Sequence, residues 1–337
     1  MNISKWLGRL FPVFCVLGTT SAFATNIQPT IVGGNEIPIS NAPWQVYVQG
    51  TNGASSVACG GTIIADNYVL TAAHCLYGFD SYSYSVYAGS AYWPTGSKHE
   101  VTASFLHEDY NDETLANDIA LLKISGTLPL TASAIKLVDE DNQIAFDTEA
   151  SLGQQDNLYV TGWGTTTQDR QNATFNLMGT PMTGVADSVC VWNTDDGINY
   201  SQTRADMTIC ANNDEVKGVC TGDSGGPLTW QDPSHASDTD SGIRLIGVVS
   251  YTWAGECANT LYPDGFAEVS HYLSWISQKM NEGGDGGDET PGGGGNGGGG
   301  SGGALVGGGG GGTTSVLAFV ILCIAGARRI VEKGIAR

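Results

Sequence analysis

The chain has 337 residues, 41% of them apolar, so it is long enough for two domains or for one large domain of two lobes with a real core. Acidic residues outnumber basic residues by 34 to 14, which gives a formal charge of −20. This balance argues against a nucleic-acid-binding protein, because such a protein needs a basic face to displace counterions from phosphate.

The first 24 residues are typical of a secretory signal peptide. Lys5 and Arg9 precede an apolar run over residues 10–18, and Ala22-Phe23-Ala24 provides the small-x-small pattern of a cleavage site. The alternative, a buried N-terminal helix, is disfavoured by Pro12 and by the lack of a polar face. Secretion would place the chain in an oxidising compartment, where disulfides persist.

The body of the chain is predicted to be all-β. Short apolar or alternating runs separated by Gly, Asn and Asp turns indicate a sandwich or a barrel, and periodicity alone does not distinguish the two. The predicted strands lie at 44–48, 62–64, 68–70, 85–88, 119–124, 158–162 and 245–249. Residues 269–280 carry apolar side chains at helical spacing and predict a closing helix. Two lobes are expected to meet near residues 138–144.

Four motifs follow one another in a fixed order. They are Ile31-Val32-Gly33-Gly34, Thr71-Ala72-Ala73-His74-Cys75, Asp118-Ile119-Ala120-Leu121-Leu122 and Gly222-Asp223-Ser224-Gly225-Gly226-Pro227-Leu228. Through these motifs, residues 31–281 resemble the trypsin/chymotrypsin family of serine endopeptidases. The resemblance implies two six-stranded antiparallel β-barrels, with lobes at about 31–140 and 141–281 and the active site in the cleft. It also implies protein or peptide substrates and no cofactor.

The residue types in these motifs suit acyl transfer. A serine hydroxyl is a poor nucleophile at neutral pH and needs an adjacent base, and histidine titrates where it can take that proton and return it. The resemblance assigns Ser224 as nucleophile, His74 as general base and Asp118 as the carboxylate that orients the imidazole. The backbone N–H groups of Gly222 and Ser224 would stabilise the oxyanion. A histidine alone is more often a core residue, but the motif around His74 favours catalysis.

Asp223, next to the nucleophile, is expected to be buried, and a buried carboxylate needs a partner. The resemblance supplies one, the α-amino group of Ile31 that is freed when a precursor is cut between Thr30 and Ile31. Residues 25–30 would then be a propeptide, and the full-length chain would be an inactive zymogen. Because Thr30 stands where many relatives have Arg or Lys, we expect an activating protease that is not trypsin-like.

Six of the eight cysteines lie outside the signal peptide and the C-terminal tail, and six cysteines allow 15 pairings. The resemblance selects the pairs Cys59–Cys75, Cys190–Cys210 and Cys220–Cys257. A zinc site is the competing interpretation, but no clustered Cys/His spacing favours it. We expect no metal of the calcium type found in the family either, because Ser90 stands where a liganding carboxylate would lie.

The expected substrate pocket departs from the trypsin pattern. The floor residue, six before Ser224, is Gly218, so the trypsin-like aspartate is missing there. Asp264 stands where many relatives have glycine, an exchange seen in the brachyurin branch, and Ser250 and Thr252 align with the second wall. The carboxylate favours Arg or Lys in the substrate, whereas the brachyurin branch has a broad preference. Because Thr252 could narrow the entrance, elastase-like and chymotrypsin-like preferences stay open.

A Gly-rich tract over residues 282–312 precedes a tail at 313–337. The tract cannot bury enough surface to fold, so it predicts a disordered linker. The apolar run 315–327 predicts a short helix, but its 13 residues are marginal for a membrane span, which needs about 20. The order of Gly-rich tract, apolar run and basic end resembles the GlyGly-CTERM sorting tail of secreted Gram-negative proteins, a temporary membrane tether removed by a rhomboid-type protease. A permanent anchor and a disordered tail are the alternatives.

These features together predict a secreted or cell-surface serine endopeptidase, exported through the inner membrane of a Gram-negative bacterium and made as a zymogen. Two other classes of protein are alternatives: a catalytically silent, protease-like binding protein, and a tethered surface protein. The first is disfavoured because His74, Asp118, Ser224 and Gly222 are all present. The second is motivated by the tail alone.

Overall fold

The fold is taken from a computed structural model, which describes residues 31–151, 157–186, 190 and 207–284. The predicted signal peptide, propeptide and C-terminal tail, and most of the Gly-rich tract, lie outside these residues. In the described part of the chain, no helix is both long enough and apolar enough to span a bilayer.

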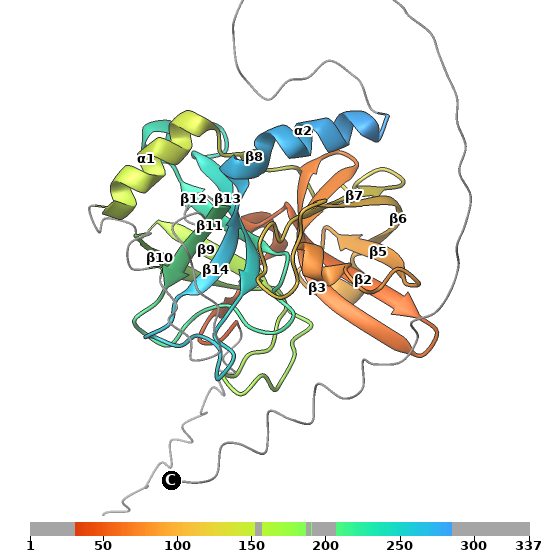
Figure 1. The fold of residues 1–337 in the computed structure, drawn as a ribbon, viewed down its shortest axis with the longest axis horizontal. Coiled ribbons are helices and arrows are strands. Elements are labelled where there is room, and N and C mark those ends of the chain that lie inside the picture. Colours follow the sequence, from red (N-terminus) through yellow and green to blue (C-terminus); the bar gives the residue numbers. More distant parts are fainter. Residues whose placement is uncertain (1–30, 152–156, 187–189, 191–206, 285–337) are drawn as a thin grey trace, which may run out of the picture. The chain divides into compact units, whose positions relative to one another are not determined.

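The described chain is mostly β-sheet, with two α-helices and several short 3-10 helices (Figure 1). The strands are β1 (Asn35–Glu36), β2 (Gln45–Asn52), β3 (Ser55–Ala65), β4 (Tyr68–Thr71), β5 (Ser83–Ala88), β6 (Ser97–Leu106), β7 (Ala120–Ile124), β8 (Lys136–Leu137), β9 (Leu158–Gly162), β10 (Met178–Val185), β11 (Thr208–Asn212), β12 (Pro227–Gln231), β13 (Ile243–Tyr251) and β14 (Asp264–Glu268). The helices are α1 (Glu140–Ser151), α2 (Leu273–Glu282), η1 (Ile39–Asn41), η2 (Ala73–Cys75), η3 (Trp93–Thr95), η5 (Pro233–His235) and η6 (Val269–Tyr272).

The first lobe is a closed antiparallel barrel in the strand order β2-β3-β4-β7-β6-β5. The pairing of β2 with β5, which begins with Val46 opposite Ala88, closes it. Val46 and Val48 alternate with less buried residues along β2, and both are almost fully buried. This two-residue period places one apolar face of each strand inside the barrel.

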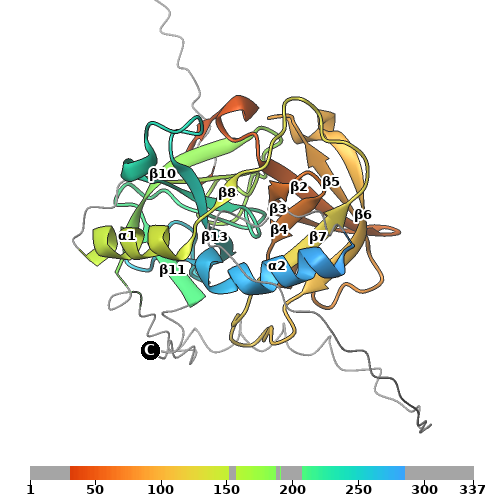
Figure 2. The ribbon, with the colours of Figure 1, turned by 90° about the horizontal axis from the view of Figure 1, so that it is seen from above.

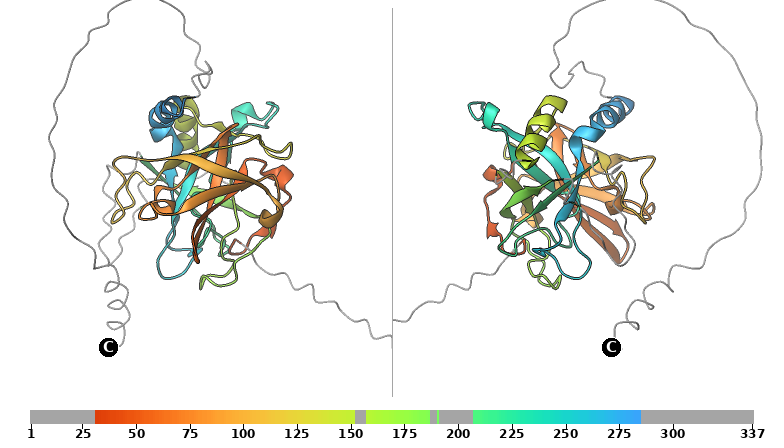
Figure 3. Two further views of the ribbon diagram at one scale, coloured as in Figure 1. Left: turned by 90° about the vertical axis from the view of Figure 1, so that its right-hand side faces the viewer. Right: turned by 60° about the vertical axis from the view of Figure 1, so that its left-hand side comes forward.

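The second lobe is a six-stranded antiparallel barrel in the order β10-β11-β14-β13-β12-β9, closed by the pairing of β10 with β9. Strand β1 extends the edge at β10, and β8 runs parallel to β13. Its interior contains fully buried apolar side chains, among them Val160, Leu228, Val248 and Phe266. The two barrels confirm the predicted fold class, and Figure 3 shows them from two further sides.

Five barrel strands were not predicted, namely β6, β10, β11, β12 and β14. The side chains of β6 are mostly exposed or half-buried, so the strand has no apolar run to reveal it. Strand β10 contains Gly179 and Pro181, and β14 begins with Asp264-Gly265, all residues that disfavour strands in isolation. Pairing with neighbouring strands overrides these local preferences.

Helix α1 is a second difference, because the sequence predicted no helix between the lobes. Asp139 caps it, accepting the N–H of Asn142 at 2.8 Å through its side chain. Phe146 packs edge-on against Trp230 of β12, with ring centroids 5.8 Å apart. The helix lacks an apolar stripe, since Ile144 is 64% exposed, and so it carries no helical periodicity.

The closing helix confirms the expectation for residues 269–280, with η6 leading directly into α2. Figure 2 shows α2 passing from the second barrel across to the first. There the Tyr68 hydroxyl of β4 donates to the carbonyl of Met280 at 2.8 Å, and Lys279 pairs with Glu108 at 2.6 Å. The helix therefore ties the C-terminal end of the second barrel to the first barrel.

Candidate active site

A buried carboxylate and an imidazole form the centre of the candidate site. Asp118, two residues before β7, has a side chain that is only 1% exposed, and its Oδ2 accepts the Nδ1–H of His74 at 2.8 Å. Its Oδ1 accepts the backbone N–H of His74 at 2.9 Å, and the Ser250 hydroxyl donates to Oδ2 at 2.6 Å. Three donors therefore satisfy the buried charge, as a buried carboxylate requires.

This pairing prepares His74 to act as a base. Burial alone lowers the pKa of His74, but the charge of Asp118 and the hydrogen bond to it raise that pKa above its ordinary value. Because Nδ1 carries the proton that Asp118 accepts, the lone pair is left on Nε2. His74 lies in η2, immediately after β4, so the barrel wall fixes the position of the ring.

The turn that carries Ser224 belongs to the second barrel but packs tightly on the first. The carbonyl of Ser224 accepts the N–H of Gly60 in β3 at 2.7 Å. A Cβ at Gly225 would overlap the Thr71 hydroxyl at the end of β4, and Gly225 has a φ of +80°. Only glycine allows both this backbone conformation and this close approach. The turn thereby reaches the strand end that leads to His74.

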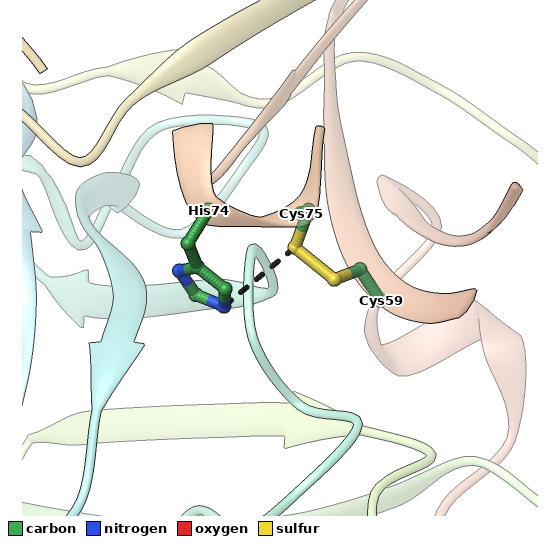
Figure 4. Close-up of side chains that lie close together, drawn as sticks. All are labelled: Cys59, His74 and Cys75. Atoms are coloured by element: carbon green, nitrogen blue, oxygen red, sulfur yellow. Dashed lines mark hydrogen bonds between the residues drawn. A yellow bond between two sulfur atoms is a disulfide. The ribbon is translucent and has the colours of Figure 1, made fainter. Parts of the chain in front are cut away.

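Figure 4 shows His74 beside the Cys59–Cys75 disulfide, with Nε2 3.8 Å from the sulfur of Cys75. The same sulfur lies 3.8 Å from the carbonyl oxygen of Ser224, so the imidazole and the turn that carries Ser224 flank one disulfide. Within the described residues, no hydrogen bond joins the Ser224 hydroxyl to the His74 ring. Such bonds are often long in free enzymes and tighten when substrate binds.

The sulfurs of Cys59 and Cys75 and a His74 nitrogen lie within 4.8 Å of one another, which is the grouping of a metal site. Both sulfurs are joined in a disulfide, however, and a disulfide has no thiolate that could bind a metal. The structure also joins Cys190 to Cys210 and Cys220 to Cys257, so all three pairs are those that the family resemblance implies.

The N–H groups of Gly222 and Ser224 are free to bind an oxyanion. In the described part of the chain, neither donates a hydrogen bond, whereas the N–H of Asp223 donates to Cys220 and that of Gly225 donates to Val249. Gly222 has a φ of +101°, which a side chain would disfavour. The turn thus leaves two backbone amides available beside the Ser224 side chain.

Asp223 is fully buried in a cradle made by glycines. Its carboxylate accepts the N–H of Gly164 at 2.8 Å and that of Cys220 at 2.9 Å, and a Cβ at Gly162 or Gly164 would overlap it. Burial raises the pKa of Asp223 to about 7, although these two N–H groups lower it. Among the described residues, no cation lies within 4.0 Å of this carboxylate. The Gly162-Trp163-Gly164 sequence, with glycines on both sides of one residue, is the pattern from which this cradle could have been predicted.

Ile31 lies in the same region. Its side chain is fully buried. The next residue, Val32, forms a β-bridge with Gly218 and packs in one cluster with Cys220. Since Cys220 binds the Asp223 carboxylate, the structure places both predicted members of the activation pair in one part of the second barrel.

The raised pKa of Asp223 has a consequence for stability. In the uncut folded chain Asp223 keeps its proton up to about pH 7, whereas in the unfolded chain an aspartate ionises near 3.8. Between these values the folded state binds more protons, so the free energy of unfolding falls as pH rises. We expect an uncut Ser224→Ala protein to need less denaturant to unfold at pH 8 than at pH 5.

Asp223→Asn in the same background should remove part of this slope, because the amide has no proton to lose. Denaturant titrations of the parent and the variant at both pH values measure the difference. Equal slopes in the two proteins would contradict the assignment of the slope to Asp223.

The expected pocket residues also come together. Asp264 is buried, and its Oδ2 accepts the N–H of Val219 at 2.9 Å. A Cβ at Gly218 would overlap this oxygen, so the carboxylate occupies the space that a side chain at 218 would take. In the described residues its Oδ1 has no hydrogen-bond partner. Burial raises the pKa of Asp264 to about 7, against the lowering effect of the nearby Thr252 hydroxyl.

One predicted wall residue has another contact. Ser250 was expected to line the pocket, but its hydroxyl donates to Asp118, so its side chain supports the carboxylate of the His74 pair. The sequence alone does not indicate this direction of the Ser250 side chain. The disulfide from Cys220 to Cys257 joins the two segments that contain Gly218 and Thr252.

Comparisons with known proteins agree with this geometry. Residues 31–276 match the family model described as Trypsin. Trypsin delta and trypsin gamma of Drosophila melanogaster are each 35% identical over 276 residues, which is 81% of this chain and 98% of theirs. The solved structure of HL collagenase is similar with a TM-score of 0.59 and 29% identity, covering 74% of this chain and 98% of its own. Neuropsin, a serine protease expressed in mouse brain, has the same fold with a TM-score of 0.58 and 23% identity, covering 74% and 99%.

Proposed function

Because the chain belongs to the trypsin family and is a serine endopeptidase, we propose that Ser224, His74 and Asp118 are the residues with which it cleaves peptide bonds. The observation that carries the proposal is the buried Asp118, which accepts the Nδ1–H of His74 at 2.8 Å. This contact leaves Nε2 as the base beside the turn that holds Ser224. Reaction of the protein that begins at Ile31 with a fluorophosphonate, with the adduct located by peptide mass spectrometry, tests it.

The reaction then runs in two halves. The Ser224 hydroxyl attacks the substrate carbonyl while His74 Nε2 takes its proton, and Asp118 stabilises the imidazolium that forms. The N–H groups of Gly222 and Ser224 bind the oxyanion. The imidazolium returns the proton to the leaving amine, which leaves an acyl-enzyme. Water, deprotonated by the same imidazole, releases the acid and restores the Ser224 hydroxyl.

Activation is proposed to occur by cleavage between Thr30 and Ile31. Support comes from Asp223, a fully buried carboxylate without a cation among the described residues, and from the buried position of Ile31. The freed ammonium of Ile31 would provide the missing charge. It would also hold the Gly222–Ser224 turn in its oxyanion-binding shape.

The substrate preference is proposed to be for Arg or Lys, or broad with basic residues included. The relatives include both trypsins and a collagenase, so their names alone do not choose between these preferences. Asp264 supports a basic preference, because its Oδ1 is buried without a hydrogen-bond partner in the described chain and would accept one from a cationic side chain.

Asp264→Gly is expected to lower kcat/KM for peptides cut after Arg by about 100-fold, in line with the loss of one buried charge pair, while cleavage after Phe stays within about threefold. The measurement is kcat/KM on two peptides that differ only at the residue before the cut. An unchanged ratio between the two peptides would show that Asp264 does not set the preference.

The neighbouring glycine provides a matched exchange. Gly218→Asp alone should disrupt the pocket, since its Cβ would overlap Asp264 Oδ2. The double variant Gly218→Asp with Asp264→Gly should recover cleavage after Arg. In this variant the space vacated by the Asp264 side chain becomes available to the new carboxylate at position 218. If the double variant is as inactive as Gly218→Asp alone, the two positions do not share one site.

The ends of the chain are proposed to be processed during export. Residues 1–24 would be removed as a signal peptide, and the tail at 313–337 would tether the protein at the membrane until a rhomboid-type protease cuts it. The support is the order of segments in the sequence. Sequencing both ends of the mature protein tests this: an N-terminus at Ile31 and a C-terminus before residue 313 agree with it, and retention of either segment contradicts it.

A further inference from the structure

A short hairpin over residues 165–173 lies against the second wall of the proposed pocket. Its two sides are joined by a β-bridge between Thr165 and Ala173, and the Thr166 hydroxyl donates to the carbonyl of Asn172 at 2.8 Å. Arg170, at the tip, has a φ of +60°, a conformation that costs a non-glycine residue energy. The fold therefore maintains an unfavourable backbone at this arginine.

The guanidinium of Arg170 binds two consecutive carbonyl groups of the wall. One Nη donates to Ala254 at 2.8 Å and the other to Trp253 at 2.6 Å. In the described residues, no carboxylate lies within 4.0 Å of Arg170, so these carbonyls are the partners that the structure gives its charge. Two further hydrogen bonds join the hairpin to Cys257. The N–H of Cys257 donates to the carbonyl of Gln168 at 3.0 Å, and the side-chain amide of Gln168 donates to the carbonyl of Cys257 at 3.2 Å.

The wall segment depends on these contacts. Among the described residues, the backbone of residues 252–256 makes no hydrogen bond with other backbone groups. Ala254, Gly255 and Glu256 are exposed, and the Trp253 ring stacks on Tyr262, with ring centroids 4.8 Å apart. Exposed backbone without such bonds is the part of a protein that opens most readily.

We propose that Arg170 is a positioning residue for substrate binding, which fixes the Trp253–Ala254 wall by holding its two carbonyls. The segment follows directly after Ser250 and Thr252, so its position sets how a substrate lies between the wall and Ser224. The inference rests on the proposed protease function. It adds a residue outside the four motifs, contributed by a hairpin that meets the wall only in the folded chain.

If Arg170 is absent, the substrate itself must order the wall when it binds. That ordering weakens binding and raises KM, whereas kcat stays nearly constant, because Arg170 contacts none of Ser224, His74 and Asp118. A merely structural role would instead reduce the fraction of active enzyme. It would leave KM unchanged in the molecules that remain folded.

The test uses the cut enzyme with its active sites counted by a burst titrant. Arg170→Ala is expected to raise KM for a peptide by about tenfold, with kcat within about twofold of the parent. Arg170→Lys should give an intermediate KM, because an ammonium can hold one carbonyl but not both in the fork geometry of a guanidinium. Lys98→Ala, which removes a positive charge on the surface of the first barrel, should match the parent.

The outcomes separate this inference from the function on which it rests. A parent enzyme that neither cleaves peptides nor reacts with the titrant contradicts the proposed function. An active parent with an unchanged KM in Arg170→Ala overturns the role of Arg170. A fall in kcat in Arg170→Ala with no recovery in Arg170→Lys overturns it as well. If the alanine variant does not fold, a KM for Arg170→Lys equal to that of the parent gives the contradicting result.

Discussion

Ser224→Ala is expected to lower kcat/KM by about 10⁴- to 10⁶-fold, the range found when a triad serine protease loses its nucleophile. Alanine cannot form the acyl-enzyme, so only the oxyanion donors and substrate binding remain to accelerate hydrolysis. The loss should come without unfolding, since the contacts that hold the turn are made by the backbone of Ser224 and by Gly225. Peptide hydrolysis by the cut enzyme measures it.

His74→Ala provides the internal check on this prediction. Residues that act as one unit lose their effect together, so the double variant of Ser224 and His74 should be no less active than the worse single variant. Ser97→Ala, an exposed serine in β6, is the matched control and should keep full activity. A loss of less than about tenfold in Ser224→Ala would be incompatible with its role as nucleophile.

Cutting the chain between Thr30 and Ile31 is expected to raise activity by about 10²- to 10⁴-fold, the equivalent of completing one buried ion pair. Asp223 lies between Gly222 and Ser224, whose N–H groups are the proposed oxyanion donors. Without a cation its buried carboxylate favours the protonated form, with its pKa raised to about 7 by burial. A paired carboxylate would instead hold the turn in one geometry.

A Thr30→Arg variant makes this measurement possible, because trypsin can then cut at the intended bond. Activity before and after brief trypsin treatment gives the gain, and the unchanged Thr30 protein, treated in the same way, is the control. Asp223→Asn in the Thr30→Arg background should abolish the gain. Equal activity of the cut and uncut Thr30→Arg proteins would mean that Ile31 has no part in activation.

The residues of the candidate site were easier to predict from the sequence than the complete fold was. His74, Asp118 and Ser224 lie in motifs whose neighbours are fixed by the local chemistry, such as Gly225, where any side chain would overlap Thr71. Each such requirement restricts the residue types within a few positions of the site residue, and this restriction is visible in the sequence. The same is true of the adjacency of Gly218 and Asp264, where one residue occupies the space that the other leaves.

The features that escaped prediction depend on contacts between distant segments. Strand β6 is specified by its pairing with β5 and β7 and has little apolar pattern of its own. The hydroxyl of Ser250 binds Asp118, 132 residues away in the chain, and no local rule indicates its direction. In the sequence, Arg170 likewise has no feature that distinguishes it from an ordinary surface cation. Its hydrogen bonds to the carbonyls of residues 253 and 254 form only in the folded chain.

The most direct test of Ser224 as the nucleophile is to react the protein that begins at Ile31 with a fluorophosphonate and to locate the adduct by peptide mass spectrometry. We expect one adduct per chain, on Ser224, and almost none in His74→Ala or in the uncut precursor. An adduct on any other residue, or no reaction in a preparation whose N-terminus is verified as Ile31, would contradict it.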